Sequence, residues 1–256
     1  MSDTFLNRRA ALAAAGGLVL AGCDKLSQSN TVQKILAGAE SLNLDGQRLV
    51  LTSGQPLARE YPASEISKDF KANGTVRPDS DAYRNLVLTG FSDWRLKLDG
   101  LVRKPASYSL AELRAMPSRT QITRHDCVEG WSAIGGWTGV PLSHLLQQSE
   151  LMPNAKYIVF RCADDLLNSQ DGSGLYYESI DMVDAFHPQT IMAYAMNGQA
   201  LPVPHGAPLR LRVERQLGYK MAKYVMQIQV VDDFSKIGFG KGGFWEDRGY
   251  EWYAGI

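Results

Sequence analysis

The chain has 256 residues, and its 27 Lys and Arg side chains balance its 27 Asp and Glu side chains, so the formal net charge is zero. This balance excludes a nucleic-acid binder that works through a broad basic field. Hydrophobic residues make up 45% and charged residues 21% of the sequence, which excludes wholesale disorder. The length fits one large domain or at most two small ones. The sequence contains no apolar run of about 18 residues or more, so no membrane span is predicted.

Residues 1–23 have the pattern of an export signal. Two arginines at 8–9 precede an apolar stretch at 10–21 that is too short to span a membrane. The arginines followed by Leu12 form R-R-x-x-L, which is typical of twin-arginine export. The signal ends in L-A-G-C and resembles a bacterial lipobox, so Cys23 is the expected lipidation site. We expect a lipid-anchored protein on the periplasmic side of the bacterial inner membrane. The alternative is an Ala-rich helix with an incidental cysteine.

The rest of the chain is predicted to hold a linker with an N-terminal arm, residues 24–67, and one folded body, residues 68–256. Alternation of apolar and polar residues predicts strands, and the S-x-x-E capping box formed by Ser109 with Glu112 predicts a short helix. The Asn197-Gly198 pair predicts a hairpin turn. Strands are expected at 94–102, 121–127, 157–162, 211–213 and 226–231, and a second short helix is expected around 145–147. Short strands interrupted by short helices predict an α+β fold built mainly on mixed β-sheet.

Lipidation of Cys23 would leave two cysteines, Cys127 and Cys162. A disulfide between them and a thiolate recruited to a metal are both open. The sequence has no C-x-x-C-H motif and no iron–sulfur spacing, so neither covalent haem nor a cluster is expected. A cysteine-protease triad at 125–127 is rejected, because three consecutive strand residues cannot converge on one substrate atom. The four scattered histidines do not favour a zinc site.

Five basic side chains are clustered within residues 210–223, and such a cluster would suit a phosphate group. They are Arg210, Arg212, Arg215, Lys220 and Lys223. The alternative interpretation is a solvated, charged edge strand.

Several motifs in a fixed order carry a resemblance to a known family. They are R-H-D-C-V-E-G-W-S at 124–132, W-x-G-V-P-L at 137–142, Y-x-M-N-G at 194–198, H-G-A-P-L-R-L-R-V at 205–213 and G-Y-K-M-A-K at 218–223. Together they resemble the sulfite oxidase family of molybdopterin oxidoreductases, most closely its periplasmic methionine-sulfoxide-reductase branch. The resemblance covers about residues 68–256. It implies a sulfite-oxidase-type molybdopterin-binding domain, and the sequence stops before the C-terminal dimerisation domain of larger relatives.

The resemblance also implies a molybdenum-molybdopterin cofactor with a single pterin and with Cys127 as the one protein ligand of the metal. A soft thiolate suits such a metal. Tyr250 matches an active-site tyrosine that donates a hydrogen bond or relays a proton. Cys162 and Asp164 are alternative candidates for one pterin contact. The other implied cofactor contacts are Phe70, Asn73, His205, Arg210, Met221, Ala222 and Lys223.

The substrate implied by the resemblance is an oxygen-atom donor such as a sulfoxide, either a small molecule or a protein side chain. Ala72 stands where sulfite oxidases carry a sulfite-binding arginine, which disfavours the alternative of a sulfite dehydrogenase. Electrons are expected from a membrane b-type haem protein or another carrier. A third alternative is a non-catalytic lipoprotein or binding module on the same fold. The retained Cys127, His205, Arg210 and Tyr250 speak against that alternative.

Overall fold

The computed structural model describes residues 56–169 and 171–256, together with residues 29, 31, 32, 34, 38, 39, 42 and 46. The chain divides into two compact units, Met1–Pro56 and Leu57–Ile256. In the first unit, the described positions from 31 to 46 are helical. The predicted signal peptide and the predicted lipidation site Cys23 lie outside the described residues. Within the described part of the chain, no helix has the length and the apolar character needed to cross a membrane.

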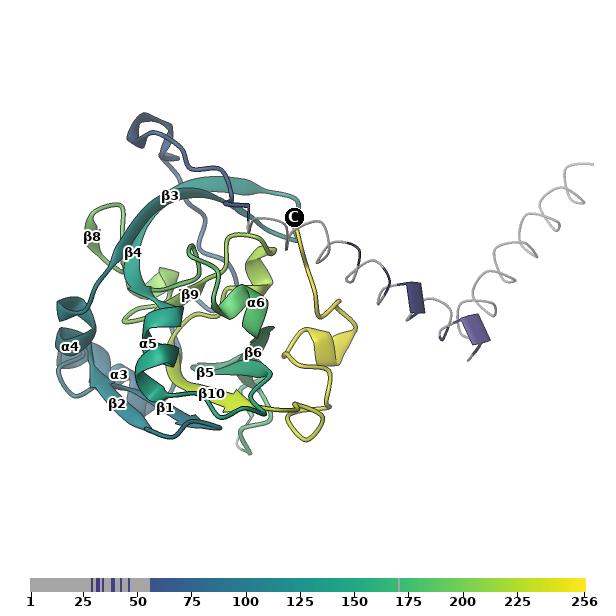
Figure 1. The fold of residues 1–256 in the computed structure, drawn as a ribbon. Helices are drawn as coiled ribbons and strands as arrows, with labels where there is room; N and C mark the ends of the chain where they lie inside the picture. The colour runs from purple at the N-terminus through teal and green to yellow at the C-terminus, as the bar shows by residue number, and fades with distance from the viewer. Residues whose placement is uncertain are drawn as a thin grey trace, which may run out of the picture. The chain divides into compact units, whose positions relative to one another are not determined.

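The second unit contains two five-stranded sheets, which Figure 1 shows with the long strands β3 and β4 curving over one side. The first sheet has the order β2-β1-β10-β5-β6, and in it β1 pairs parallel with β10. Its strands are β1 (Arg95–Gly100), β2 (Ala106–Ser109), β5 (Tyr157–Asp165), β6 (Leu175–Asp181) and β10 (Val225–Val231). The second sheet has the order β3-β4-β7-β8, with β9 also paired to β7. Its strands are β3 (Arg119–Asp126), β4 (Ser132–Pro141), β7 (Ile191–Met196), β8 (Gln199–Ala200) and β9 (Arg210–Arg212).

The helices among the described residues of this unit are short. The α-helices are α3 (Asp81–Leu88), α4 (Leu110–Ala115), α5 (Leu142–Ser149) and α6 (Met182–Ala185). The 3-10 helices are η1 (Ala63–Glu65), η2 (Val203–His205), η3 (Gly218–Lys220) and η4 (Glu246–Arg248). Mixed sheets with short helices confirm the predicted α+β fold.

Local sequence signals account for several of these elements. Ser109 accepts a hydrogen bond from the backbone N–H of Glu112, and the Glu112 side chain accepts one from Ser109, so α4 begins with the predicted capping box. Asn197 and Gly198 both have positive φ and join β7 to β8 in the predicted hairpin. Both signals were read correctly because each depends only on residues that are close together in the sequence.

The alternation along β3 decides which of its side chains reach the interior. Gln121, Thr123 and His125 are buried, while Thr120 and Arg124 are exposed. Cys127 follows directly after the strand and is also buried. Residues at i and i+2 of a strand share a face, so β3 directs His125 and Cys127 toward the same side.

The segment before α3 packs on the second sheet and carries residues toward this same side. The backbone N–H of Tyr61 donates to the carbonyl of Ile122 on β3 (2.9 Å). Ser67 forms two hydrogen bonds with the backbone of Ile134 on β4. Phe70 then packs edge-on against the buried Trp137 ring, with ring centroids 5.5 Å apart. These contacts fix residues 70–75 beside the end of β3.

Candidate active site

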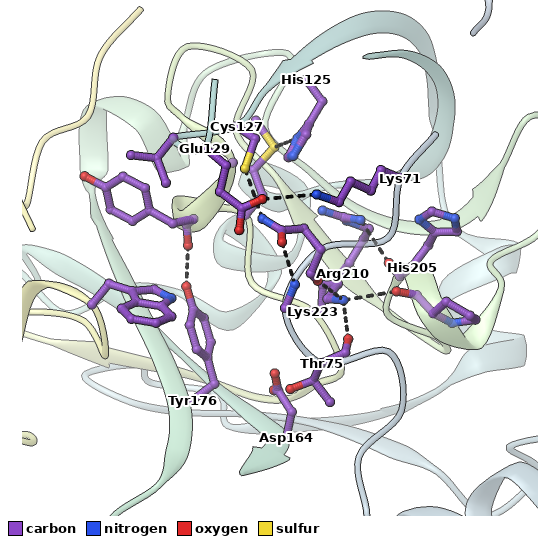
Figure 2. A pocket seen from close by; sticks show the side chains of 18 of the residues that line it. Lys71, Thr75, His125, Cys127, Glu129, Asp164, Tyr176, His205, Arg210 and Lys223 are labelled. Atoms are coloured by element: carbon purple, nitrogen blue, oxygen red, sulfur yellow. Dashed lines mark hydrogen bonds and ion pairs between the residues drawn. The ribbon is translucent and has the colours of Figure 1, made fainter. Parts of the chain in front are cut away.

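A cavity of about 190 Å³ lies where seven segments of the second unit meet. Its wall is formed by residues 70–75, the end of β3 with the following turn, the end of β5, the start of β6, η2 with β9, the stretch 218–223, and the C-terminal segment 245–250. Figure 2 shows that these side chains point toward one another from both sheets. Cys127 lies at one end of the cavity, and Arg210, His205 and Lys223 lie together at the other.

Cys127 presents its thiol to the cavity from the turn that follows β3. The turn is closed by hydrogen bonds from the N–H of Cys127 to the carbonyl of Trp131 (2.9 Å) and from the N–H of Gly130 to the carbonyl of Cys127 (3.0 Å). The side-chain amide of Asn73 donates to Cys127 Sγ at 3.0 Å. Burial raises the pKa of the Cys127 thiol, and it outweighs the N–H groups of Glu129 and Asn73 that lower this pKa. The geometry therefore orients the sulfur and gives it a hydrogen-bond donor.

The opposite end of the cavity concentrates positive charge. Arg210 is buried, its Nη1 donates to the carbonyl of His205 (2.9 Å), and its Nε has no partner among the described residues. Burial and the neighbouring Arg212 lower the pKa of Arg210 to about 9. Burial and Arg210 lower the pKa of Lys223 to about 7, and burial with Arg210 and Lys223 lowers the pKa of His205 to about 4. Neighbouring cations that lower one another's pKa are typical of a site that binds an anion.

Lys223 also holds the wall together. Its Nζ donates to the carbonyls of Asn73 (2.7 Å), Thr75 (2.5 Å) and Pro204 (3.0 Å), so it joins the 70–75 segment to η2. Asp164 lies beside Thr75, and its Oδ1 has no partner among the described residues. Burial raises the pKa of Asp164 to about 6.

The structure separates the five basic residues that were grouped as a phosphate site. Arg210 and Lys223 line the cavity. The other three form buried ion pairs away from it: Arg212 with Glu214, Arg215 with Asp184, and Lys220 with Glu178 and Glu246. The alternative of a solvated edge strand is wrong as well, because all of these residues except Lys223 are fully or almost fully buried.

Most of the predicted site residues meet at the cavity. Those on its wall are Phe70, Asn73, Cys127, Asp164, His205, Arg210, Met221, Lys223 and Tyr250. Ala222 is buried behind the wall, where its carbonyl accepts from the N–H of Leu211 and fixes β9. Cys162 is buried and lines a second cavity with Tyr177 and Phe244. Of the two alternatives for one contact, Asp164 therefore lies on the first cavity and Cys162 does not. Both remaining cysteines are free, so they form no disulfide.

The structure does not place Ala72 on the cavity wall. Ala72 is half-buried, while its neighbours Phe70, Lys71 and Asn73 line the cavity. Lys71 pairs with Glu129 (3.4 Å), and Trp131 donates to the same carboxylate (3.2 Å). The expectation that residue 72 faces the substrate pocket is therefore unsupported, and Lys71 supplies a cation where the comparison with sulfite oxidases had indicated none.

Tyr250 reaches the cavity from the C-terminal segment and remains 39% exposed. Its ring stacks on Trp245 with centroids 5.4 Å apart and meets Tyr219 edge-on at 5.1 Å. Trp245 and Tyr219 also line the cavity. The phenol is thus held by two aromatic rings at the border between the cavity and solvent.

Several residues of the wall were not predicted from the sequence, among them His125, Glu129 and Tyr176. For His125 a signal was present: it stands two residues before Cys127 on a predicted strand, which puts both on one face. The rejection of a three-residue triad agrees with the geometry, because Asp126 turns away to Arg124 and Ser132. Tyr176 had no local signal, since its position depends on the pairing of β5 with β6.

The donor set fits a soft metal at one end of the cavity and a phosphate-bearing group at the other. A thiol is the preferred protein ligand of a soft metal. A buried guanidinium with a free Nε and a neighbouring ammonium can bind phosphate oxygens. Asp164 and Asn73 add polar groups for a heterocycle between the two ends.

Comparisons with known proteins agree with this donor set. Residues 85–237 match the family described as oxidoreductase molybdopterin binding domain. The chain is 38% identical over 252 residues, 98% of its length and 86% of the relative's, to a protein of Azospira oryzae provisionally named protein-methionine-sulfoxide reductase subunit YedZ1. It is 37% identical over 203 residues to the protein-methionine-sulfoxide reductase catalytic subunit MsrP of Xanthomonas campestris pv. campestris. That match covers 72% of this chain and 61% of the relative.

Among solved structures, the sulfane dehydrogenase SoxCD of Paracoccus pantotrophus aligns with 56% of this chain and 39% of its own, at 26% identity and a TM-score of 0.49. The family match covers more than half of the chain, and the first relative matches almost all of it. The chain belongs to the molybdopterin-binding oxidoreductases of the sulfite oxidase family and is a molybdenum-dependent oxidoreductase.

Proposed function

We propose that this protein reduces a sulfoxide, with a methionine sulfoxide side chain as the substrate group, and that Cys127 is the protein ligand of molybdenum in a single-pterin cofactor. The observation that carries the proposal is the cavity with a buried thiol that accepts from an amide at one end, and at the other end Arg210 and Lys223, which have no carboxylate partner among the described residues. The relatives' names, which specify protein-methionine-sulfoxide reduction, support the choice of substrate.

Each wall residue has a defined task in this proposal. Arg210, Lys223 and His205 bind the phosphate end of the cofactor, and Asn73 orients the Cys127 sulfur. When bound, the cofactor supplies two-electron oxygen-atom transfer. Reduction of a sulfoxide to a sulfide and water consumes two electrons and two protons. The Tyr250 hydroxyl, at the open border of the cavity, donates a hydrogen bond to the sulfoxide oxygen and can pass on a proton from solvent.

A sulfite dehydrogenase is the second candidate, and Lys71 is the observation that favours it. Its ammonium lines the cavity near Cys127, where it could attract an anion. Two features reduce this support: Lys71 is paired with Glu129, and its side chain is 63% exposed. A screened, already neutralised cation binds an anion weakly.

The cellular setting is part of the same proposal. The R-R-x-x-L pattern and the lipobox support export by the twin-arginine route and anchoring to the inner membrane through Cys23. The enzyme would then receive electrons from a membrane b-type haem protein or another carrier. Labelling with a radioactive fatty acid in a bacterial host tests the anchor: the label should enter the wild-type chain and be absent from Cys23→Ser, and a labelled variant would contradict the assignment.

The activity itself is tested by an anaerobic assay with a reduced dye and a panel of sulfoxides and N-oxides, with sulfite oxidation measured in parallel. We expect turnover of free and peptide-bound methionine sulfoxide and little oxidation of sulfite. The Cys127→Ser variant is the matched control, because its side chain differs by one atom. Rapid sulfite oxidation without sulfoxide turnover would establish the second candidate instead.

A further inference from the structure

His125 has no role in the proposed function, although it is buried on the cavity wall two residues before Cys127. Figure 2 shows His125 and Cys127 among the side chains that line the cavity. The ring lies between the aromatic rings of Phe70 and Trp131, each with its centroid 5.5 Å away. This packing restricts the movement of the imidazole ring. The hydrogen-bonding role of each ring nitrogen then depends on the group that it contacts.

Arg212 determines the state of one of these nitrogens. Its Nη1 lies 3.1 Å from His125 Nδ1. A guanidinium carries only donors, so Nδ1 has to be the acceptor in this contact. An imidazole that accepts at Nδ1 carries its hydrogen on Nε2. The tautomer of His125 therefore follows from the position of Arg212.

Arg212 is itself held in place. The residue is fully buried, and its fork donates twice to Glu214, from Nε to Oε1 (2.9 Å) and from Nη2 to Oε2 (2.5 Å). Gln121 donates to the same carboxylate at 2.8 Å. Arg119 donates to Gln121 Oε1 at 2.8 Å, which extends the hydrogen-bonded chain to the rim of the sheet. Arg119 and Arg212 can only donate, so the direction of their hydrogen bonds is fixed.

Gly218 lies against the Nε2 edge of the ring, and only a glycine at this position leaves space beside that edge. A Cβ at Gly218 would overlap the Cε1 and Nε2 atoms of His125. Gly218 and His125 both line the cavity. No residue in the described part of the chain accepts a hydrogen bond from Nε2, so this N–H is available to a ligand.

We infer that Arg212 fixes His125 as the Nε2–H tautomer and that this N–H is a preset hydrogen-bond donor to the bound molybdopterin cofactor. The acceptor is a lone pair on the pterin or on its sulfur atoms. The position of the ring favours the cofactor over the substrate: His125 Nδ1 is 3.3 Å from Sδ of the buried Met221, whereas the exposed Val128 and Tyr250 mark the solvent side. The inference rests on the proposed cofactor site and is independent of which substrate is reduced.

The tautomer can be measured in the oxidised holoenzyme labelled with ¹⁵N-histidine. Long-range proton–nitrogen correlations distinguish a protonated Nε2 with a bare Nδ1 from the opposite tautomer. We expect the first pattern for the histidine whose signals disappear in His125→Gln. The opposite tautomer, or exchange between the two, would overturn the inference whatever the enzyme's activity.

The role of the donor is tested by cofactor retention in three variants. His125→Gln keeps an N–H near the Nε2 position, while His125→Leu removes it, so molybdenum per protein after dialysis should stay high in the first and fall in the second. The affinity loss for one hydrogen bond is roughly tenfold. Gly218→Ala should also lose molybdenum, because the added Cβ displaces the Nε2 edge of His125. Arg212 and the imidazole that it contacts are both still present in this variant. This variant serves if His125→Leu does not fold, which circular dichroism would show.

The same variants separate the cofactor from the substrate. Full molybdenum content in His125→Leu combined with a raised KM for sulfoxide would mean that the donor serves the substrate, and the inference would be wrong. Loss of molybdenum with an unchanged KM for the remaining active fraction supports it. A failure of sulfoxide reduction in the wild-type protein would leave both the NMR result and the molybdenum content interpretable.

Discussion

Asn73 and Lys223 are 150 residues apart in the chain, yet Lys223 Nζ donates directly to the Asn73 carbonyl at 2.7 Å. The side chain of Asn73 contacts the Cys127 sulfur while its carbonyl accepts from Lys223. One residue thus joins the metal end to the phosphate end of the site. Substitutions at such positions are expected to change cofactor binding before they change the fold.

Replacement of Cys127 by serine is expected to abolish turnover and to leave the fold intact. A hydroxyl is a harder and weaker ligand than a thiolate for a metal that is already bound by sulfur. The side chain is buried and loses at most one hydrogen bond, which comes from Asn73. The free energy of unfolding should therefore change by no more than about 1 kcal/mol. Activity and a denaturant titration measure the two effects, and near-wild-type activity would refute the ligand assignment.

Anion binding at the cation end is expected to weaken as the pH rises through about 7. Burial and Arg210 lower the pKa of Lys223 to about 7, so the ammonium is charged below this pH and neutral above it. Asp164, whose pKa burial raises to about 6, gains negative charge over the same range and acts in the same direction. Sulfate keeps a constant charge here, so calorimetric titration of cofactor-free protein at pH 6 and pH 8 measures the change.

The matched control for this measurement is Lys223→Arg, because a guanidinium stays charged throughout the range. We expect tighter sulfate binding at pH 6 than at pH 8 in the wild-type protein and a much smaller difference in the variant. Equal pH dependence in both proteins would show that Lys223 does not titrate in the site. The Lys223→Met variant should bind sulfate weakly at both values.

At the scale of single elements, β4 depends on close approach of its backbone to β7. A Cβ at Gly139 would overlap the carbonyl oxygen and backbone of Met192, at the point where the register between the two strands shifts. Backbone atoms of a central strand pair cannot move aside cheaply, so Gly139→Ala should destabilise the protein by roughly 3 kcal/mol. Gly136→Ala in the same strand is the control, because its nearest neighbours lie at 3.5 Å and beyond. Urea unfolding of both variants checks the expectation, and equal stabilities would contradict it.

The same scale explains which elements the sequence could predict. The α4 capping box and the Asn197-Gly198 hairpin depend on neighbours in the chain and were predicted correctly. Strands β4 and β6 were missed because most of their residues are buried, so the alternation of polar and apolar residues is lost. The choice between Cys162 and Asp164 depends on the irregular pairing of β5 with β6 between Arg161 and Asp165, which no sequence pattern marks.

At the scale of the whole molecule, the cavity is completed by a C-terminal segment that a buried ion cluster ties to the first sheet. Lys220 Nζ lies 2.5 Å from Glu178 on β6 and 2.5 Å from Glu246 on η4. All three side chains are essentially inaccessible to solvent. The cluster connects η3, which precedes Met221 and Lys223, with the segment that carries Tyr250. Three parts of the wall therefore share one electrostatic anchor.

Replacement of Lys220 by methionine should destabilise the molecule by about 3 to 5 kcal/mol, because it leaves buried carboxylates without their cation. Burial raises the pKa of Glu178 well above its usual value and Lys220 opposes this rise, so removal of Lys220 should raise the pKa of this carboxyl further. A raised folded-state pKa contributes stability at low pH that is lost as the pH rises through that pKa. The loss of stability in the variant should accordingly be larger at pH 8 than at pH 5, as measured by urea unfolding at the two values.

The triple variant Lys220→Met, Glu178→Gln, Glu246→Gln separates the charge effect from the loss of packing. With no buried charge left uncompensated, most of the lost stability should return, and the pH dependence contributed by Glu178 should disappear. The fluorescence of Trp245 offers a second readout, because this residue directly precedes η4 and its ring stacks on Tyr250. If the cluster anchors this segment, Lys220→Met should also expose the Trp245 indole to solvent and shift its fluorescence to the red. An unchanged Trp245 signal in a destabilised variant would show that the cluster stabilises the sheet without positioning the segment that carries Tyr250.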